Sequence, residues 1–200
     1  MRERIGIFGG TFDPPHLGHL ILASEARTQL KLTRLLWVLT PLPPHKLNRR
    51  ISLLDDRLAM VKLALNDETS FELSTIEIER ESPHYTLDTM RVLSQQYPHT
   101  DLILLLGGDS LRDLPTWHRP ADLVAVCHQI GVMRRPDDSI DMAALEKKII
   151  GLKEKVNFIE APLLEIASSE IRRRVSHGLP FRYYLLPVVY QYIQEHNLYK

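Results

Sequence analysis

The sequence has little cysteine, no net charge and no apolar run long enough to span a membrane. Cys127 is the single cysteine among 200 residues, so an internal disulfide is excluded and we expect its thiol to be buried as a small apolar group. Lysine and arginine together number 25, as do aspartate and glutamate, which argues against a general nucleic-acid-binding surface. Residues 1–4 show no secretory signal pattern. We therefore expect a soluble cytoplasmic protein that binds neither membranes nor nucleic acids.

Hydrophobic residues, at 44% of the chain, suffice for a sizeable core. They form short apolar runs that alternate with helix-like stretches, which is typical of an α/β fold with a mainly parallel sheet. The expected strands are Ile5–Phe8, Leu35–Leu39, Phe71–Ile78, Leu102–Leu106, Ile130–Met133 and Val156–Ile159. The expected helices are Leu17–Leu30, Leu54–Leu65 (with a capping box at Ser52 and Asp55), Thr86–Gln96, Ala143–Ile150, Ser169–Val175 and Pro187–His196. The expected loops are Thr40–Arg50 and Pro136–Asp141.

The segment after the first expected strand carries the strongest functional signal. In a parallel α/β sheet, ligands bind beyond the carboxyl ends of the strands. Gly9 and Gly10 let the backbone approach a ligand there, and Pro14 and Pro15 suit the approach to a helix. The amino end of that helix offers free N–H groups and a partial positive charge, so we expect an anion as the ligand. The segment reads Gly9-Gly10-Thr11-Phe12-Asp13-Pro14-Pro15-His16-Leu17-Gly18-His19.

His16 and His19 are three residues apart, so on a helix they lie on one face. Two imidazoles and the helix amides form a phosphate site that strengthens as charge develops in a transition state, and Gly18 keeps the surface between them low. Two other interpretations remain open, namely two partly exposed surface residues or two ligands of a zinc ion. A zinc site needs a third protein ligand, and no Cys or His pair elsewhere has supporting spacing. We expect Asp13 to shape the turn rather than to bind metal.

This segment resembles the signature of the nucleotidyltransferase superfamily that carries a His-x-Gly-His motif. Members of that superfamily act on the α-phosphate of a nucleoside triphosphate. The resemblance implies a Rossmann-like, doubly wound parallel sheet with flanking helices, in a single nucleotidyltransferase domain over residues 1–200. It implies that His16 and His19 are catalytic and bind ATP together with Gly9, Gly10, Thr11, Phe12 and Gly18.

A second candidate phosphate contact lies near residue 170. We expect Ser168 and Ser169 to be N-caps of a helix whose first-turn amides bind phosphate, and Arg172 to reach the same anion bidentately. A Ser-Ser pair before a helix is usually only a cap. The superfamily carries a similar segment against the triphosphate, so the resemblance implies ATP contacts for these three residues and a catalytic role for Arg172. Ala167 stands where a serine is common, and we assign it no role.

A proline-rich loop, Pro43-Pro44-His45-Lys46, follows the second expected strand. Lys46 is a point charge on a stiffened loop, although a lone lysine is more often an ordinary surface residue. Nicotinate-nucleotide adenylyltransferases carry a similar loop that contacts phosphates. That resemblance implies that His45 and Lys46 bind the mononucleotide and that Lys46 is catalytic.

Three further residues indicate the acceptor substrate. Asp109 follows two glycines after the most apolar strand, where a carboxylate can accept hydrogen bonds from ribose hydroxyls. Trp117 can stack on an aromatic ring of a ligand or serve as a core aromatic. Thr86 opens a helix as an N-cap or as a ligand contact.

Together these segments resemble the bacterial nicotinate-nucleotide adenylyltransferases nearly from end to end. The resemblance implies that Asp109 meets a ribose, that Trp117 stacks on the pyridine ring and that Thr86 holds the nicotinate carboxylate. Arg135 occupies the family's Arg-Pro turn and is expected to contact the mononucleotide. Tyr184–Tyr199 resembles the family's last helix.

The implied reaction transfers the adenylyl group of ATP to nicotinate mononucleotide and gives nicotinate adenine dinucleotide and pyrophosphate. We expect Mg²⁺ to arrive with ATP and no dedicated protein metal site. Nicotinamide mononucleotide and 4'-phosphopantetheine remain alternative acceptors, and a non-catalytic nucleotide-binding module is a less favoured alternative. A Rossmann oxidoreductase is disfavoured because Gly-x-Gly-x-x-Gly is missing after the first strand. No oligomeric state is predicted.

Overall fold

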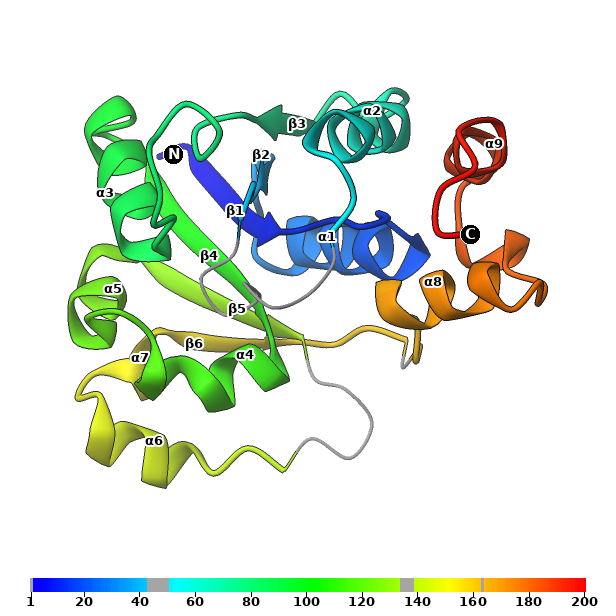
Figure 1. The fold of residues 1–200 in the computed structure, drawn as a ribbon. Helices are drawn as coiled ribbons and strands as arrows, with labels where there is room; N and C mark the ends of the chain where they lie inside the picture. Colours follow the sequence, from blue (N-terminus) through cyan, green and yellow to red (C-terminus); the bar gives the residue numbers. More distant parts are fainter. Residues whose placement is uncertain (1, 43–50, 134–138, 163) are drawn as a thin grey trace.

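The computed structural model describes residues 2–42, 51–133, 139–162 and 164–200, which form a parallel sheet between layers of helices (Figure 1). The strands are β1 (Arg4–Gly10), β2 (Arg34–Leu39), β3 (Phe71–Ser74), β4 (Asp101–Gly107), β5 (Gln129–Met133) and β6 (Val156–Ile159). The helices are α1 (Leu17–Gln29), α2 (Leu54–Leu65), α3 (Thr86–Gln96), α4 (Gly108–Asp113), α5 (Pro120–Val126), α6 (Met142–Lys148), α7 (Leu152–Lys155), α8 (Ser168–Ser176) and α9 (Pro187–Glu195), with short 3₁₀ turns η2 (Leu114–Thr116) and η3 (Arg182–Tyr184).

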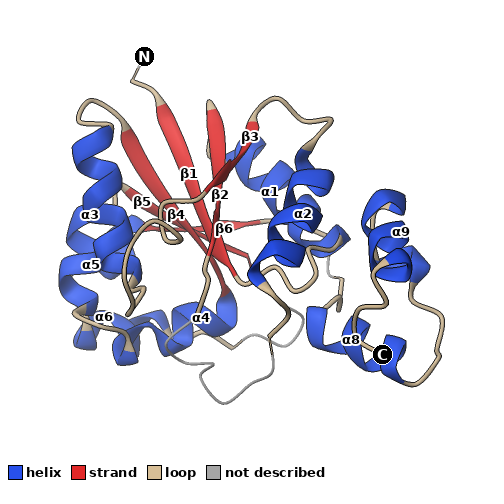
Figure 2. Ribbon diagram, turned by 45° about the horizontal axis from the view of Figure 1, so that its top comes forward, coloured by secondary structure: helices blue, strands red, loops and turns tan. Residues whose placement is uncertain are grey.

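Both faces of the sheet are covered, which is why the strands are apolar throughout. On one face, Ile7 and its register partners Leu36 and Leu104 pack with side chains of α3 to α7. On the other face, Phe8 and Trp37 pack with side chains of α1 and α2. Figure 2 shows α3 and α5 on one side of the sheet and α1 and α2 on the other. The predicted doubly wound α/β fold is confirmed.

The loops that follow the strands gather at one edge of the sheet, because all neighbouring strands are parallel. The strand order β3-β2-β1-β4-β5-β6 reverses direction between β1 and β4. Ligands of such sheets bind at that point of reversal. Gly10 ends β1 and Gly107 ends β4, so two of the predicted segments leave the sheet from neighbouring strands.

The last helices form a further apolar cluster beside α2. Ile171 of α8 and Val189 and Ile193 of α9 lie in one cluster with Met60 and Ala64 of α2. Figures 1 and 2 both show α8 and α9 beyond the edge of the sheet, with the last residues of the chain close to α8. These elements therefore stand near the edge where β1 ends.

Several sequence predictions about the elements were wrong. The expected strand Phe71–Ile78 ends at Ser74, because the N–H groups of Ile78 and Glu79 turn back to the carbonyl oxygen of Thr75. Helix α2 has Leu53 as its N-cap without a side-chain cap, so the capping box at Ser52 and Asp55 is not formed. The short helices α4, α5 and α7 were not predicted at all.

The prediction for Cys127 is confirmed, since only 1% of this residue is exposed. In the part of the chain that the structure describes, no helix combines the length and the apolar character that a membrane crossing requires.

Candidate active site

The turn after β1 is built around the ring of Phe12. Phe12 is 2% exposed and has a φ of 47°, a left-handed conformation that is uncommon for a non-glycine residue. A Cβ on Gly10 would lie 2.7 Å from Cζ of Phe12, so the aromatic ring covers Gly10 and only glycine fits there. A Cβ on Gly9 would meet nothing within 4 Å. A side chain at Gly9 would therefore face open space, whereas the position of a side chain at Gly10 is occupied by Phe12; both glycines line the cavity described below.

His16 and His19 lie together at the start of α1, as predicted. Their rings are stacked, with centroids 3.6 Å apart and planes 20° apart, and His16 is the more buried of the two. The backbone N–H of His16 donates to Nδ1 of His19 over 3.2 Å. Because Nδ1 accepts, the proton of the neutral His19 ring is on Nε2, and this is the atom that can donate to an oxyanion.

Aromatic side chains hold the His19 ring from the other side. Its centroid lies 5.2 Å from that of Phe12, 5.8 Å from that of Phe8 and 6.2 Å from that of Trp37, all in edge-on geometry. The ring is thus fixed by packing and by one hydrogen bond, which is how an enzyme preorganises a donor.

The space around Gly18 is limited by the His16 ring. A Cβ at this position would lie 3.1 Å from Nδ1 of His16 and 3.6 Å from Cβ of Ile166. The first distance is tighter than an ordinary contact, so a side chain here would push the His16 ring. Gly18 therefore makes room for His16 and for the segment before α8.

Helix α8 is tied directly to the turn after β1, so the two predicted phosphate segments do meet. Oγ of Ser168 donates to the carbonyl oxygen of Pro14 over 2.9 Å, and Nη1 of Arg172 donates to that of Asp13 over 2.6 Å. The predicted capping was wrong, because Ala167 is the N-cap and Ser168 and Ser169 lie within the first turn of the helix. The amino end of α8 and Arg172 therefore stand beside the His16–His19 pair.

A cavity of about 730 Å³ opens next to this turn, at the switch point of the sheet. It is lined by the ends of β1 and β4, the start of α3 and the turn around Trp117. Among the predicted site residues, Gly9, Gly10, Thr11, Thr86, Asp109 and Trp117 line it. His16, His19, Ser168 and Arg172 are not among its lining residues, so the site has two adjoining parts that meet at the turn after β1.

The part of the cavity around Asp109 is organised by local contacts. Oδ1 of Asp109 accepts the N–H of Ser110 over 3.0 Å, and a Cβ on Gly107 would come within 2.6 Å of the same oxygen. Gly107 is therefore required for Asp109 to turn back over the end of β4. Thr86 is the first residue of α3 and Tyr85 its N-cap, so the N-cap interpretation of Thr86 was wrong, while its place in the cavity lining fits a ligand contact.

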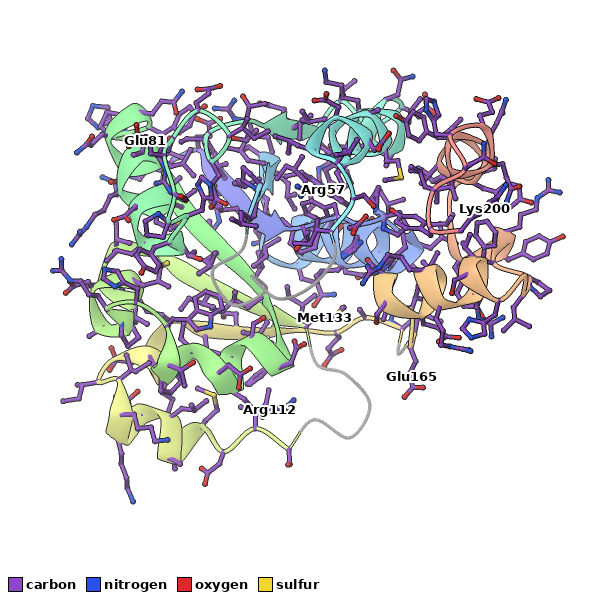
Figure 3. All side chains as sticks on the ribbon, viewed as in Figure 1. Arg57, Glu81, Arg112, Met133, Glu165 and Lys200 are labelled. Atoms are coloured by element: carbon purple, nitrogen blue, oxygen red, sulfur yellow. The ribbon has the colours of Figure 1, made fainter. Side chains whose placement is uncertain are left out.

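Arg57, near the start of α2, was not predicted from the sequence; it is 2% exposed (Figure 3). Its guanidinium donates to four backbone carbonyls from three segments, which belong to Thr11, Thr40, Pro41 and Ser52 at 2.8–3.2 Å. Burial lowers the pKa of Arg57 from its usual value, and the nearby Asp13 opposes this shift. The guanidinium stays charged at neutral pH and joins the loops after β1 and β2 to the start of α2. Only backbone atoms accept from it, so no residue pattern could have indicated it.

A buried polar pair in the cavity lining was also not predicted from the sequence. Oγ1 of Thr89 donates to Oε1 of Glu77 over 2.6 Å. Glu77 and His84 both line the cavity, and within the described residues Oε2 of Glu77 and Nδ1 of His84 are buried without a hydrogen-bond partner. This wall offers polar atoms to a ligand or to water.

Three predicted contacts, His45, Lys46 and Arg135, fall outside the described residues and stay predictions. In the described ranges, no group of three or more His, Cys, Asp or Glu side chains is arranged to hold a metal ion. The interpretation of His16 and His19 as zinc ligands therefore finds no third ligand there.

The chain is similar to known proteins over nearly its whole length. Residues 7–174 match the cytidylyltransferase-like family. The chain is 42% identical over 198 residues to the probable nicotinate-nucleotide adenylyltransferase of Thermomicrobium roseum, which covers 99% of this chain and 92% of the relative. It is 39% identical to the probable nicotinate-nucleotide adenylyltransferase of Dehalococcoides mccartyi, with 98% and 97% covered.

The fold has solved counterparts. Plasmodium falciparum nicotinic acid mononucleotide adenylyltransferase complexed with NaAD superposes with a TM-score of 0.82 at 22% identity, covering 99% of this chain and 98% of that one. A putative nicotinate-nucleotide adenylyltransferase from Vibrio parahaemolyticus gives a TM-score of 0.68 at 16% identity, covering 98% and 95%.

Proposed function

This chain belongs to the cytidylyltransferase-like family and, within it, to the nicotinate-nucleotide adenylyltransferases, and we propose that it transfers the adenylyl group of ATP to nicotinate mononucleotide in NAD biosynthesis. The observation that carries the proposal is the stacked His16–His19 pair, in a turn that Arg172 contacts and that adjoins a cavity large enough for a nucleotide.

In the proposed reaction, a phosphate oxygen of nicotinate mononucleotide attacks the α-phosphorus of ATP. A new phosphorus–oxygen bond forms, the bond between the α-phosphorus and the bridging oxygen breaks, and pyrophosphate leaves with that oxygen. The attacking phosphate is already anionic at neutral pH, so no side-chain nucleophile is required. The protein's contribution is positioning and stabilisation of charge.

We assign the ATP end of the site to the turn after β1 and to α8. Nε2 of His19 donates to a non-bridging oxygen of the α-phosphate, and His16 supports it from the stacked position. The first-turn amides of α8, Ser168, Ser169 and Arg172 bind the remaining phosphate oxygens. The fixed rotamer of His19, with Nδ1 already occupied, supports this role.

We assign the acceptor end to the cavity. Asp109 accepts hydrogen bonds from a ribose, Thr86 and the amino end of α3 bind the nicotinate carboxylate, and Trp117 stacks on the pyridine ring. Their shared place in the cavity lining supports these roles. His45, Lys46 and Arg135 complete the predicted contacts with the mononucleotide, and Lys46 is the predicted catalytic residue among them.

We further propose that residues 1–200 act as one domain and that the protein works in the cytoplasm. The ties between α8 and the turn after β1 support the first point. We expect Mg²⁺ to arrive bound to ATP, because this ion keeps several waters and binds readily through phosphates.

The test is an assay of pyrophosphate release from ATP with three acceptors in parallel, namely nicotinate mononucleotide, nicotinamide mononucleotide and 4'-phosphopantetheine. We expect the highest kcat/KM with nicotinate mononucleotide. Faster turnover of either other acceptor would reassign the substrate, and no release with any acceptor would leave only a nucleotide-binding protein.

A further inference from the structure

Asp13, in the turn after β1, forms hydrogen bonds with three residues that are distant in the sequence, and it is not among the residues that line the cavity. It is 3% exposed. Its Oδ1 accepts the hydroxyl of Tyr199 over 2.7 Å, its Oδ2 accepts the N–H of Ser52 over 3.2 Å, and its carbonyl oxygen accepts Nη1 of Arg172. A buried carboxylate of this kind depends on its donors, because losing one leaves a desolvated charge. Asp13 therefore connects Arg172 to a residue at the far end of the chain.

The way α9 ends brings Tyr199 to this position. Asn197 has a φ of 51°, and the N–H of Leu198 donates to the carbonyl oxygen of Ile193 over 3.1 Å. The N–H of Asn197 donates to the carbonyl oxygen of Gln194. This is the Schellman pattern, in which a left-handed residue stops a helix and reverses the chain. The reversal directs the Tyr199 ring into the apolar cluster beside α2 and its hydroxyl to Asp13.

We propose that Tyr199 is a positioning residue for ATP, acting through Asp13 on Arg172; this rests on the proposed function of the site. The hydroxyl of Tyr199 donates a hydrogen bond to Oδ1 of Asp13, so this oxygen does not need another donor. Nη1 of Arg172 lies 3.9 Å from Oδ2 of the same carboxylate, beyond hydrogen-bond distance but within reach of a small rotation. Without the tyrosine hydroxyl, Asp13 takes the guanidinium as its charge-assisted partner, and Arg172 is drawn away from the phosphates.

The chain offers a matched control for this inference. Tyr192, on α9, also donates its hydroxyl to a carboxylate, Oδ1 of Asp56, over 3.0 Å. Asp56 lies in the first turn of α2 and has no contact with Arg172 among the described hydrogen bonds and ion pairs. Tyr199→Phe and Tyr192→Phe therefore each remove one hydroxyl that donates to an aspartate. Of the two pairs, only Tyr199–Asp13 includes a residue of the turn after β1.

The experiment compares wild type, Tyr199→Phe and Tyr192→Phe in thermal unfolding, in steady-state kinetics with ATP and nicotinate mononucleotide, and in calorimetric titration with ATP alone. For Tyr199→Phe we expect the KM and Kd of ATP to rise about 5- to 10-fold, the size expected for one lost hydrogen bond, with the KM of the mononucleotide unchanged. For Tyr192→Phe we expect neither constant to change. A double-mutant cycle adds Arg172→Lys, in whose background Tyr199→Phe should have little further effect on ATP.

The outcomes separate this inference from the proposed function. Turnover by the wild-type protein tests the proposed function. The titration with ATP alone tests the role of Tyr199, and it does so even if the protein turns over none of the acceptors. The inference is overturned if Tyr199→Phe leaves the ATP constants unchanged, if both substrates weaken equally, if the cycle with Arg172→Lys is additive, or if the wild-type protein does not bind ATP.

Discussion

At the scale of single residues, the site depends on side chains whose orientation is set before a ligand arrives. His19 is fixed by the N–H of His16 on one edge and by three aromatic rings around it. A donor held in this way does not reorganise as charge develops on a transferring phosphate, which is the condition for a large electrostatic contribution.

Replacing His19 tests that contribution directly. We expect His19→Ala to lower kcat by roughly 10² to 10³, the range for losing one donor to a transition state. Steady-state kinetics measures this, and His177→Ala, at the exposed C-cap of α8, serves as the control with unchanged kcat. A folded His19→Ala protein with a kcat close to that of wild type would remove His19 from the mechanism.

Trp117 is the corresponding test at the acceptor end. We expect Trp117→Ala to weaken binding of nicotinate mononucleotide by about 1 to 2 kcal/mol, because it loses a stacking surface, and to leave ATP binding nearly unchanged. Trp117→Phe should recover part of the loss. Calorimetric titrations with each substrate check this, and equal losses for both substrates would mean that Trp117 only supports the fold.

The position and the role of some site residues could be predicted from the sequence, and those of others could not. The His16–His19 pair could be predicted because a spacing of three residues at the start of a helix brings two side chains together, although His16 is the N-cap of α1, with an extended backbone, and only His19 lies within the helix. The tight contact at Gly18 could not be predicted, because the position of the neighbouring His16 ring, whose Nδ1 would lie 3.1 Å from a Cβ at Gly18, depends on how that ring stacks on His19. Asp13 was expected to shape the turn, and its contacts with Ser52 and Tyr199 agree with that expectation.

At the scale of elements, the strands and long helices followed from apolar runs, since covered parallel strands need no polar face. The short elements did not follow. Helix α4 begins at Gly108, directly after β4, and its six residues carry too little periodicity to be separated from a loop. The end of β3 at Ser74 is likewise set by the turn at Thr75 and not by a change in composition.

Arg57 joins elements and can be tested at this scale. Arg57→Met keeps the apolar stem but leaves four carbonyl oxygens without their donor, so we expect the free energy of unfolding to fall by about 2 to 4 kcal/mol. Chemical denaturation measures this. Lys62→Met, an exposed change on the same helix, should alter stability by no more than about 0.5 kcal/mol. Similar losses for the two variants would show that the Arg57 contacts contribute nothing specific.

At the scale of the whole molecule, the sheet separates two apolar layers, and a third cluster attaches α8 and α9 to α2. The third cluster places α8 and Tyr199 against the turn after β1. Sequence periodicity indicated these helices but not where they pack, because their partners in α2 are more than a hundred residues away.

Cys127 reports on the integrity of this core. Burial raises the pKa of its thiol to about 12, so at about pH 8 the folded protein holds almost no thiolate. We expect a thiol-reactive dye to label the denatured chain rapidly and the native chain only as fast as it opens. Above about pH 9 the thiol ionises in the unfolded chain but stays protonated in the folded protein. The free energy of unfolding therefore declines as the pH rises above about 9, and below that pH this thiol causes no such loss. Rapid labelling of the native protein would contradict the core described here.

The most direct measurement is a crystal structure of the protein with a non-hydrolysable ATP analogue. The account predicts that the triphosphate lies across the turn after β1, with an α-phosphate oxygen within hydrogen-bond distance of Nε2 of His19 and with Arg172 on the neighbouring phosphates. A nucleotide bound at another edge of the sheet, with these side chains turned to water or holding a zinc ion, would contradict it.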